Sequence, residues 1–91
     1  MDKPKTQARE VLYRDQHSTI EVVLLTKRTS QGCTHNAYLK RAGVRVGPSM
    51  FLGFTTENNV DRAAEKVNDL IKASVTAAMM HCYQTIYKGL E

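Results

Sequence analysis

The feature that most constrains the fold is a stretch of about thirty residues near the C-terminal end that carries a single apolar stripe. Within residues 59–88, apolar or small residues recur about every 3.7 positions, which is the period of one helix face. Asn58 is expected to cap the helix start with Asp61 in its first turn, and Lys88 and Gly89 to close its end. The stripe consists of Val60, Ala64, Val67, Ile71, Val75, Met79, Cys82 and Ile86.

The length of this helix predicts an oligomer. At 1.5 Å per residue it would be about 45 Å long, whereas a compact globule of this chain length is about 31 Å across. The helix would then overhang the monomer, and the apolar stripe on the overhang would need cover. A homodimer supplies that cover, with the interface at Val75, Met79, Cys82 and Ile86. A kink near Ala77-Ala78 that folds the last turns back is the alternative.

The first half of the chain reads as strands. Residues 20–27 are rich in β-branched residues and leucine and are apolar on both faces, which is typical of a central strand. Because one helix covers only one face of a sheet, the other face is expected to meet a partner or a ligand. Residues 10–14 alternate as a strand that leads into a hairpin, although residues 8–14 also fit a short helix. A turn is expected at residues 30–32.

Two further strands are expected before the helix. Residues 37–41 and 44–46 read as one strand with a bulge near Gly43, followed by a turn at Gly47-Pro48 and a strand over residues 50–55. In the last strand, alternation places Met50, Leu52 and Phe54 on one face and Phe51 on the other. The sequence therefore predicts an α+β fold, a small antiparallel sheet of about four strands followed by one long helix (ββββα) that packs on one sheet face.

Chain length and composition predict a single domain over residues 1–91, with residues 1–7 flexible and Leu90-Glu91 matching the scar that a common expression vector leaves. No apolar run approaches the roughly 18 residues of a membrane span, and no secretory signal is apparent. Two distant cysteines, Cys33 and Cys82, are typical of reduced thiols, so a cytoplasmic location without membrane contact is expected.

The net charge of +4 comes from the middle of the chain. Residues 22–56 contain five basic residues and no acidic residue, whereas the flanking segments are close to neutral. A positive surface is therefore expected where this segment folds, and phosphates or an acidic protein would bind there. Tyr38 shares a strand face with Lys40, and Phe51 could join that face to stack bases. The candidate binding residues are Lys27, Arg28, Lys40, Arg41, Arg45 and Tyr38.

Catalytic and metal-binding patterns are not apparent in the sequence. The glycines match no phosphate-binding loop, and no nucleophile elbow is present. Cys33 and His35 fall in an expected loop, and His81 and Cys82 would point about 100° apart on a helix, so neither pair suits zinc. Cys82 is expected to be inert because it is buried in the helix stripe. No enzyme activity, metal or cofactor is expected.

These observations predict a small dimeric nucleic-acid-binding protein that uses a basic sheet surface. The alternative is an interaction module, such as a regulator or inhibitor, that docks its sheet face or edge on an acidic protein partner. The expected ββββα order is similar to that of the Whirly-type binders of single-stranded nucleic acid, which also dimerise, and the similarity is one of architecture alone.

Overall fold

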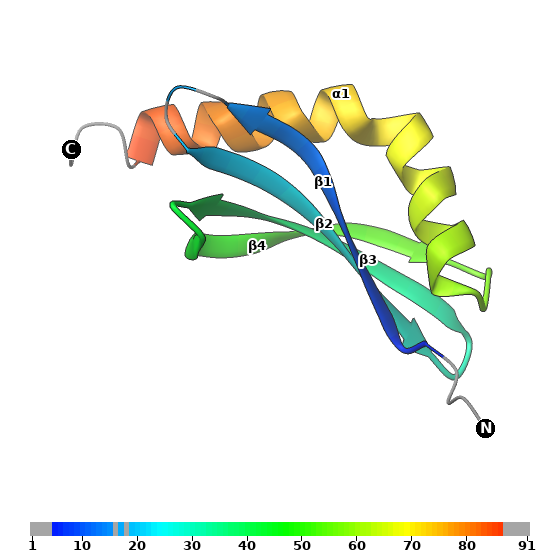
Figure 1. Cartoon of the computed structure of the whole chain (residues 1–91). Helices are drawn as coiled ribbons and strands as arrows, with labels where there is room; N and C mark the ends of the chain where they lie inside the picture. Colours follow the sequence, from blue (N-terminus) through cyan, green and yellow to red (C-terminus); the bar gives the residue numbers. More distant parts are fainter. Residues whose placement is uncertain (1–4, 16, 18, 87–91) are drawn as a thin grey trace.

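The computed structural model describes residues 5–15, 17 and 19–86 and contains one four-stranded sheet and one helix (Figure 1). The α+β class and the ββββα order predicted from the sequence are confirmed. The elements are β1 (Gln7–Asp15), β2 (Ile20–Thr29), β3 (Gly32–Arg41), β4 (Val44–Thr55) and α1 (Val60–Ile86).

The sheet is an antiparallel meander in which the strands stand side by side in chain order, β1-β2-β3-β4. Residues 8–14 belong to β1, so the strand interpretation of this segment is correct and the helix alternative is wrong. The turn expected at residues 30–32 joins β2 to β3, and Gly32 is the first residue of β3. The sequence had suggested a loop for Cys33. In the structure it is buried in strand β3.

The sequence predicted a bulge near Gly43 and a turn at Gly47-Pro48, and the structure has the reverse arrangement. Ala42 and Gly43, with φ of 50° and 80°, form the tight turn between β3 and β4, because a two-residue hairpin turn of this kind needs two positive φ angles. Gly47-Pro48 lies inside β4, where the register shifts between the pairs Ala37↔Met50 and Leu39↔Val46. Proline is tolerated there because β4 is an edge strand and the segment is irregular.

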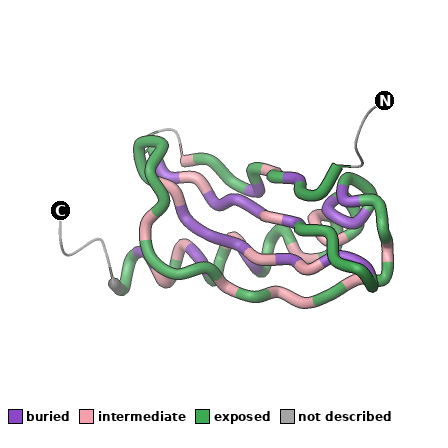
Figure 2. Tube along the Cα trace, turned by 90° about the horizontal axis from the view of Figure 1, so that it is seen from below, coloured by how far each residue is buried: buried purple, intermediate pink, exposed green. Residues whose placement is uncertain are grey.

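Helix α1 packs on one face of the sheet, chiefly against β1, β2 and β3 (Figure 1). Its predicted stripe faces the core from Val60 to Met79, and the structure adds Ala63 and Tyr83 to the buried side. Figure 2, seen from below, shows the buried residues concentrated along the two central strands. The sheet contributes Ala8, Leu12, Ile20, Val22, Leu24, Cys33, Ala37 and Leu39 to this core.

The helix begins one residue later than predicted. Asn59, not Asn58, is the cap, because its Oδ1 accepts a hydrogen bond from the backbone N–H of Arg62 at 3.1 Å. The Asn59 backbone N–H in turn donates to Oε1 of Glu57 at 3.2 Å. This bond is the main reason why the pKa of the Glu57 carboxyl is lowered, with Lys66 adding to the effect. The two bonds fix the point at which the chain turns from β4 into α1.

The overhang expected for the helix is absent. The domain is elongated, 46 × 26 × 20 Å, because strands of up to 12 residues make the sheet about as long as the 27-residue helix, roughly 40 Å. Val75 and Met79 are consequently buried against the sheet of their own chain, while Cys82 is half-buried. They therefore do not form the uncovered stripe from which the dimer was inferred. The homodimer itself stays a prediction.

The helix is also bent rather than straight (Figure 1). The bend lies in its yellow segment, N-terminal to the site at Ala77-Ala78 where the sequence suggested a kink. It lets α1 follow the twisted sheet. Lys88, Gly89, Leu90 and Glu91, the side chain of Ile86 and residues 1–4 lie outside the described residues. No helix in the described part of the chain is long and apolar enough to cross a membrane.

One buried polar cluster lies in the core between the sheet and the start of α1. His35 is 1% exposed, and its Nδ1 and Nε2 atoms are hydrogen-bonded to the hydroxyls of Thr26 (2.9 Å) and Thr55 (3.0 Å). Burial lowers the pKa of His35, because the protonated ring would lose its hydration. Both ring nitrogens of the neutral form are satisfied, so the core holds a neutral histidine.

This histidine makes the stability of the fold depend on pH. The folded pKa lies below the ordinary value of about 6.5, so the unfolded chain takes up the proton first as the pH falls. The stabilisation is complete above pH 6.5 and declines below it. We expect the urea midpoint to fall between pH 7.5 and 5.5, and His35→Gln to flatten this change. An unchanged wild-type midpoint would show that the folded core accommodates the protonated ring.

Candidate nucleic-acid interface

The sheet face opposite α1 is covered by no other described element (Figures 1 and 2). Residues paired directly across antiparallel strands share a face, so the register assigns this open face residue by residue. Four cross-strand rows result. They are Arg14, Glu21, Lys40 and Arg45; Val11, Val23 and Tyr38; Arg9, Leu25, Asn36 and Phe51; and Gln7, Lys27, Thr34 and Phe54.

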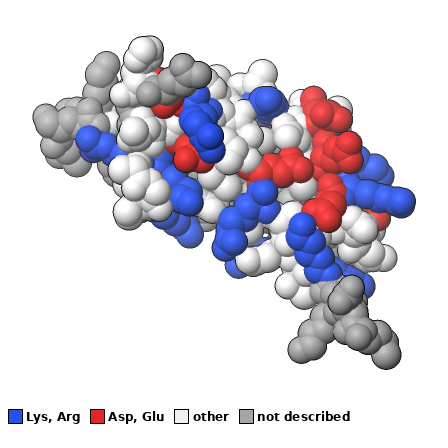
Figure 3. Space-filling view, in the orientation of Figure 1, with Lys and Arg blue, Asp and Glu red and all other residues white. Residues whose placement is uncertain are grey.

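The open face is strongly biased toward positive charge. Five basic residues lie on it and a single acidic one, Glu21, which pairs with Arg14 at 3.4 Å, so the face carries a net charge of +4 (five minus one). The remaining described acidic residues belong to the opposite side of β1, to the β4–α1 connection or to α1. In Figure 3, most of the acidic side chains gather toward the first half of α1. The face is therefore suited to a polyanion.

The centre of the open face is apolar. Val23 and Tyr38 are only 4% and 7% exposed although no other described element covers this face. The guanidinium of Arg45 lies 5.1 Å from the centre of the Tyr38 ring, a cation–π contact. Tyr38 therefore holds a cation in place and is not itself available for stacking. Val11 at the β1 edge is 45% exposed.

Phe51 and Phe54 both lie on the open face, opposite Asn36 and Thr34. The placement of Phe54 with Met50 and Leu52 is thus wrong, since those two residues pack against the core on the helix side. The cause is a register shift at Leu52, where β4 has one residue more than β3. Phe51 is on the face predicted for it.

The structure brings four of the six predicted binding residues together. Lys27, Lys40, Arg45 and Tyr38 share the open face, and Lys40 pairs directly with Arg45. Arg28 and Arg41 point to the other side of the sheet, because each adjoins an open-face residue in its strand. Arg9 and Arg14 were missed, because regular alternation would place residues five positions apart on opposite faces. The register shift between Val11 and Tyr13 in β1 puts both on this face.

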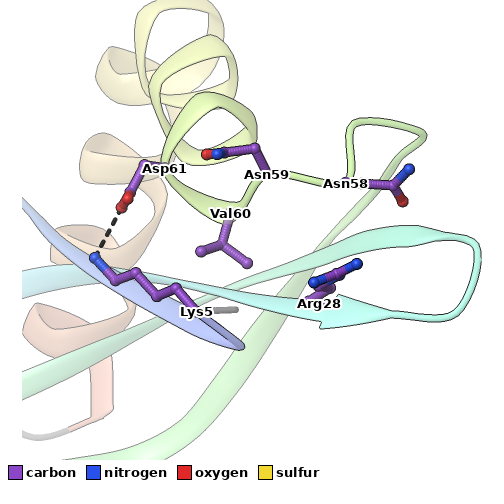
Figure 4. Close-up of a pocket in the computed structure, with 6 residues that line it drawn as sticks. All are labelled: Lys5, Arg28, Asn58, Asn59, Val60 and Asp61. Atoms are coloured by element: carbon purple, nitrogen blue, oxygen red, sulfur yellow. Dashed lines mark hydrogen bonds and ion pairs between the residues drawn. The ribbon is translucent and has the colours of Figure 1, made fainter. Parts of the chain in front are cut away.

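Arg28 lines a separate hollow of about 280 Å³ at the start of α1. Figure 4 shows Lys5 and Arg28 on either side of Val60, with the Lys5 ammonium turned to Asp61. The Lys5 Nζ and Asp61 Oδ1 atoms are 2.9 Å apart and both side chains are exposed. Asp61 thus offsets the charge of Lys5. The side chain of Asn59 already accepts a hydrogen bond from the backbone N–H of Arg62. The hollow completes no site for an anion.

The sulfur and imidazole groups do not assemble into a reactive centre in the described part of the chain. No three His, Cys, Asp or Glu residues among those described are placed to hold a metal ion. The Cys33 thiol donates a hydrogen bond to the carbonyl oxygen of Glu57 at 3.0 Å, and burial raises its pKa, which disfavours the nucleophilic thiolate. Cys33 therefore has a packing role in the core.

Comparison with protein-family models, with curated proteins and with solved structures finds no match to this chain.

Proposed function

We propose that this protein binds nucleic acid on the open face of its sheet. One observation carries the proposal: the face without a helix has five basic residues against one acidic residue, and two exposed aromatic rings share that face. Lysine and arginine side chains neutralise phosphates, and aromatic rings stack on bases. We assign phosphate binding to Arg9, Arg14, Lys27, Lys40 and Arg45.

The roles of these cations differ. Arg45 is oriented by Tyr38, so its guanidinium loses less freedom on binding a phosphate than a mobile side chain would. Arg14 is shared with Glu21 and contributes less. Lys27 has no acidic residue beside it in its cross-strand row, and Lys40 stands between Glu21 and Arg45. Lys27, Lys40 and Arg45 are therefore counted among the principal contacts, and Arg9, whose row also lacks an acidic residue, joins them. The free thiols Cys33 and Cys82 suit action in a reducing cytoplasm.

An acidic protein partner is the second candidate. The apolar centre of the face within a basic rim is the arrangement of many protein interfaces, and Val11 and Phe51 are exposed enough to be buried by a partner. The two candidates differ in salt dependence and in the ligand that satisfies them. If the natural partner is an acidic protein, we expect this protein to leave oligonucleotides unbound.

Fluorescence anisotropy with labelled oligonucleotides at about 50 and 200 mM salt tests the proposal. Three to five phosphate contacts on a single strand give a slope that corresponds to about a 20- to 130-fold loss of affinity over this fourfold range. We therefore expect micromolar or tighter binding at the lower salt and a steep loss at the higher one. Absence of binding at 50 mM salt would contradict the nucleic-acid proposal and leave the acidic protein, which capture of acidic partners would then test.

A further inference from the structure

The two phenylalanines of β4 are placed by an irregular backbone. In a regular strand, residues three positions apart point to opposite faces. Between the pairs His35↔Gly53 and Asn36↔Phe51 the strand contains the additional residue Leu52, and Gly53 adopts a φ of 140° that side-chain-bearing residues rarely reach. The bulge thus turns Phe51 and Phe54 to the same face.

Both rings remain accessible after they have been placed there. Phe51 is 66% exposed and Phe54 is 47% exposed, although aromatic rings are usually buried where a core is available. Phe54 lies over Gly32, where a Cβ would come within 2.8 Å of the ring. The fold therefore supports the Phe54 ring on one side and leaves the pair open to a ligand on the other.

The spacing of the two rings fits separated bases. They stand opposite residues two positions apart on β3, so their rows are about 6.7 Å apart. Successive bases stacked in a duplex are about 3.4 Å apart, half of this spacing. Two rings at this separation suit bases that have left their mutual stack. In a duplex the base faces are covered by their neighbours and are not available to either ring.

Basic residues lie on two sides of the two rings, across the sheet and along the strand direction. Lys27 lies in the cross-strand row of Phe54, two strands away, while Lys40 and Arg45 lie two rows beyond Phe51. We infer that the open face binds single-stranded in preference to double-stranded nucleic acid, with one base stacked on each of Phe51 and Phe54. This inference rests on the proposed function, because it specifies which nucleic acid the basic face takes.

The test compares four probes of one sequence and length: single-stranded DNA, single-stranded RNA and the two corresponding duplexes. Anisotropy at 50 mM salt is expected to give at least tenfold tighter binding of a single strand than of its duplex. Phe51→Ala/Phe54→Ala is expected to weaken single-strand binding at least about 30-fold and to leave the salt slope unchanged, because the phosphate contacts remain. Duplex binding should change little. The DNA and RNA arms show which strand is preferred.

Leu70→Ala is the matched control, because Leu70 is an 84% exposed apolar residue on α1, away from the open face. It should bind like the wild type. If the alanine pair fails to fold by circular dichroism, Phe51→Leu/Phe54→Leu keeps the apolar bulk and removes the aromatic faces. Equal affinity for single strand and duplex, or undiminished single-strand binding by the folded variant, overturns the inference and leaves the proposed function standing. Absence of binding to all four probes overturns both.

Discussion

Replacing Lys27, Lys40 and Arg45 by alanine is expected to weaken nucleic-acid binding by about two orders of magnitude. If each cation contributes about 1 kcal/mol to binding, the loss is about 3 kcal/mol, or roughly 150-fold in Kd. Three phosphate contacts fewer should also lower the slope of log Kd against log salt by about 2 on a single strand. Anisotropy at several salt concentrations measures both quantities. The fold should survive, because none of the three side chains belongs to the core.

The matched control is Arg62→Ala/Lys72→Ala, which removes exposed charge from the helix on the other side of the molecule. It lowers the net charge by two but touches no open-face residue. If both variants weakened binding in proportion to the charge removed, the protein would be acting as a diffuse polycation. Unchanged binding by the triple variant would contradict the assignment of the phosphates to these residues.

Met79→Glu is expected to unfold most of the protein. Met79 is 3% exposed within the core cluster, so the change removes packing worth about 2–5 kcal/mol and buries a carboxylate without a partner. A chain of this length has a total stability of about 5–14 kcal/mol. A urea titration followed by circular dichroism should show a midpoint shifted to much lower urea or no folded baseline.

Leu70→Glu places the same charge on an exposed position of the same helix and should change stability by no more than about 0.5 kcal/mol. Light scattering of the unchanged protein tests the homodimer separately. A wild-type dimer together with a folded, monomeric Met79→Glu variant would support the interface expected from the sequence. It would also contradict the burial of Met79 in its own core.

The elements with a clear apolar pattern could be predicted from the sequence. The stripe from Val60 to Met79 and the two-sided apolar run at the centre of β2 predicted the helix and the central strand, because burial imposes both patterns. The cap was displaced by one position, since Asn58 and Asn59 are chemically equivalent caps. Only the packing of the turn after β4 distinguishes them.

The faces of β4 could not be predicted, because alternation holds only while the register is regular. The shift at Leu52 reverses the side on which Phe54 lies, and Gly43 and Gly47 have exchanged roles as turn and bulge. The prediction of the candidate site also failed at the step of assigning residues to faces, since Arg28 and Arg41 point away from the open face. Adjacent basic residues such as Lys40 and Arg41 point to opposite faces of a strand. The net charge of a sequence segment therefore overestimates the charge on one face of the sheet.

The meander order has a consequence for how the chain acquires its structure over time. Each strand pairs only with its neighbour in the sequence, so the sheet forms through local closures that are rapid. During synthesis, residues 7–55 leave the ribosome before any of α1 does, and the sheet then exposes Val22 and Leu24 as well as its open face. Until α1 emerges and packs, the nascent protein presents two uncovered sheet faces instead of one, and aggregation competes most strongly during this interval.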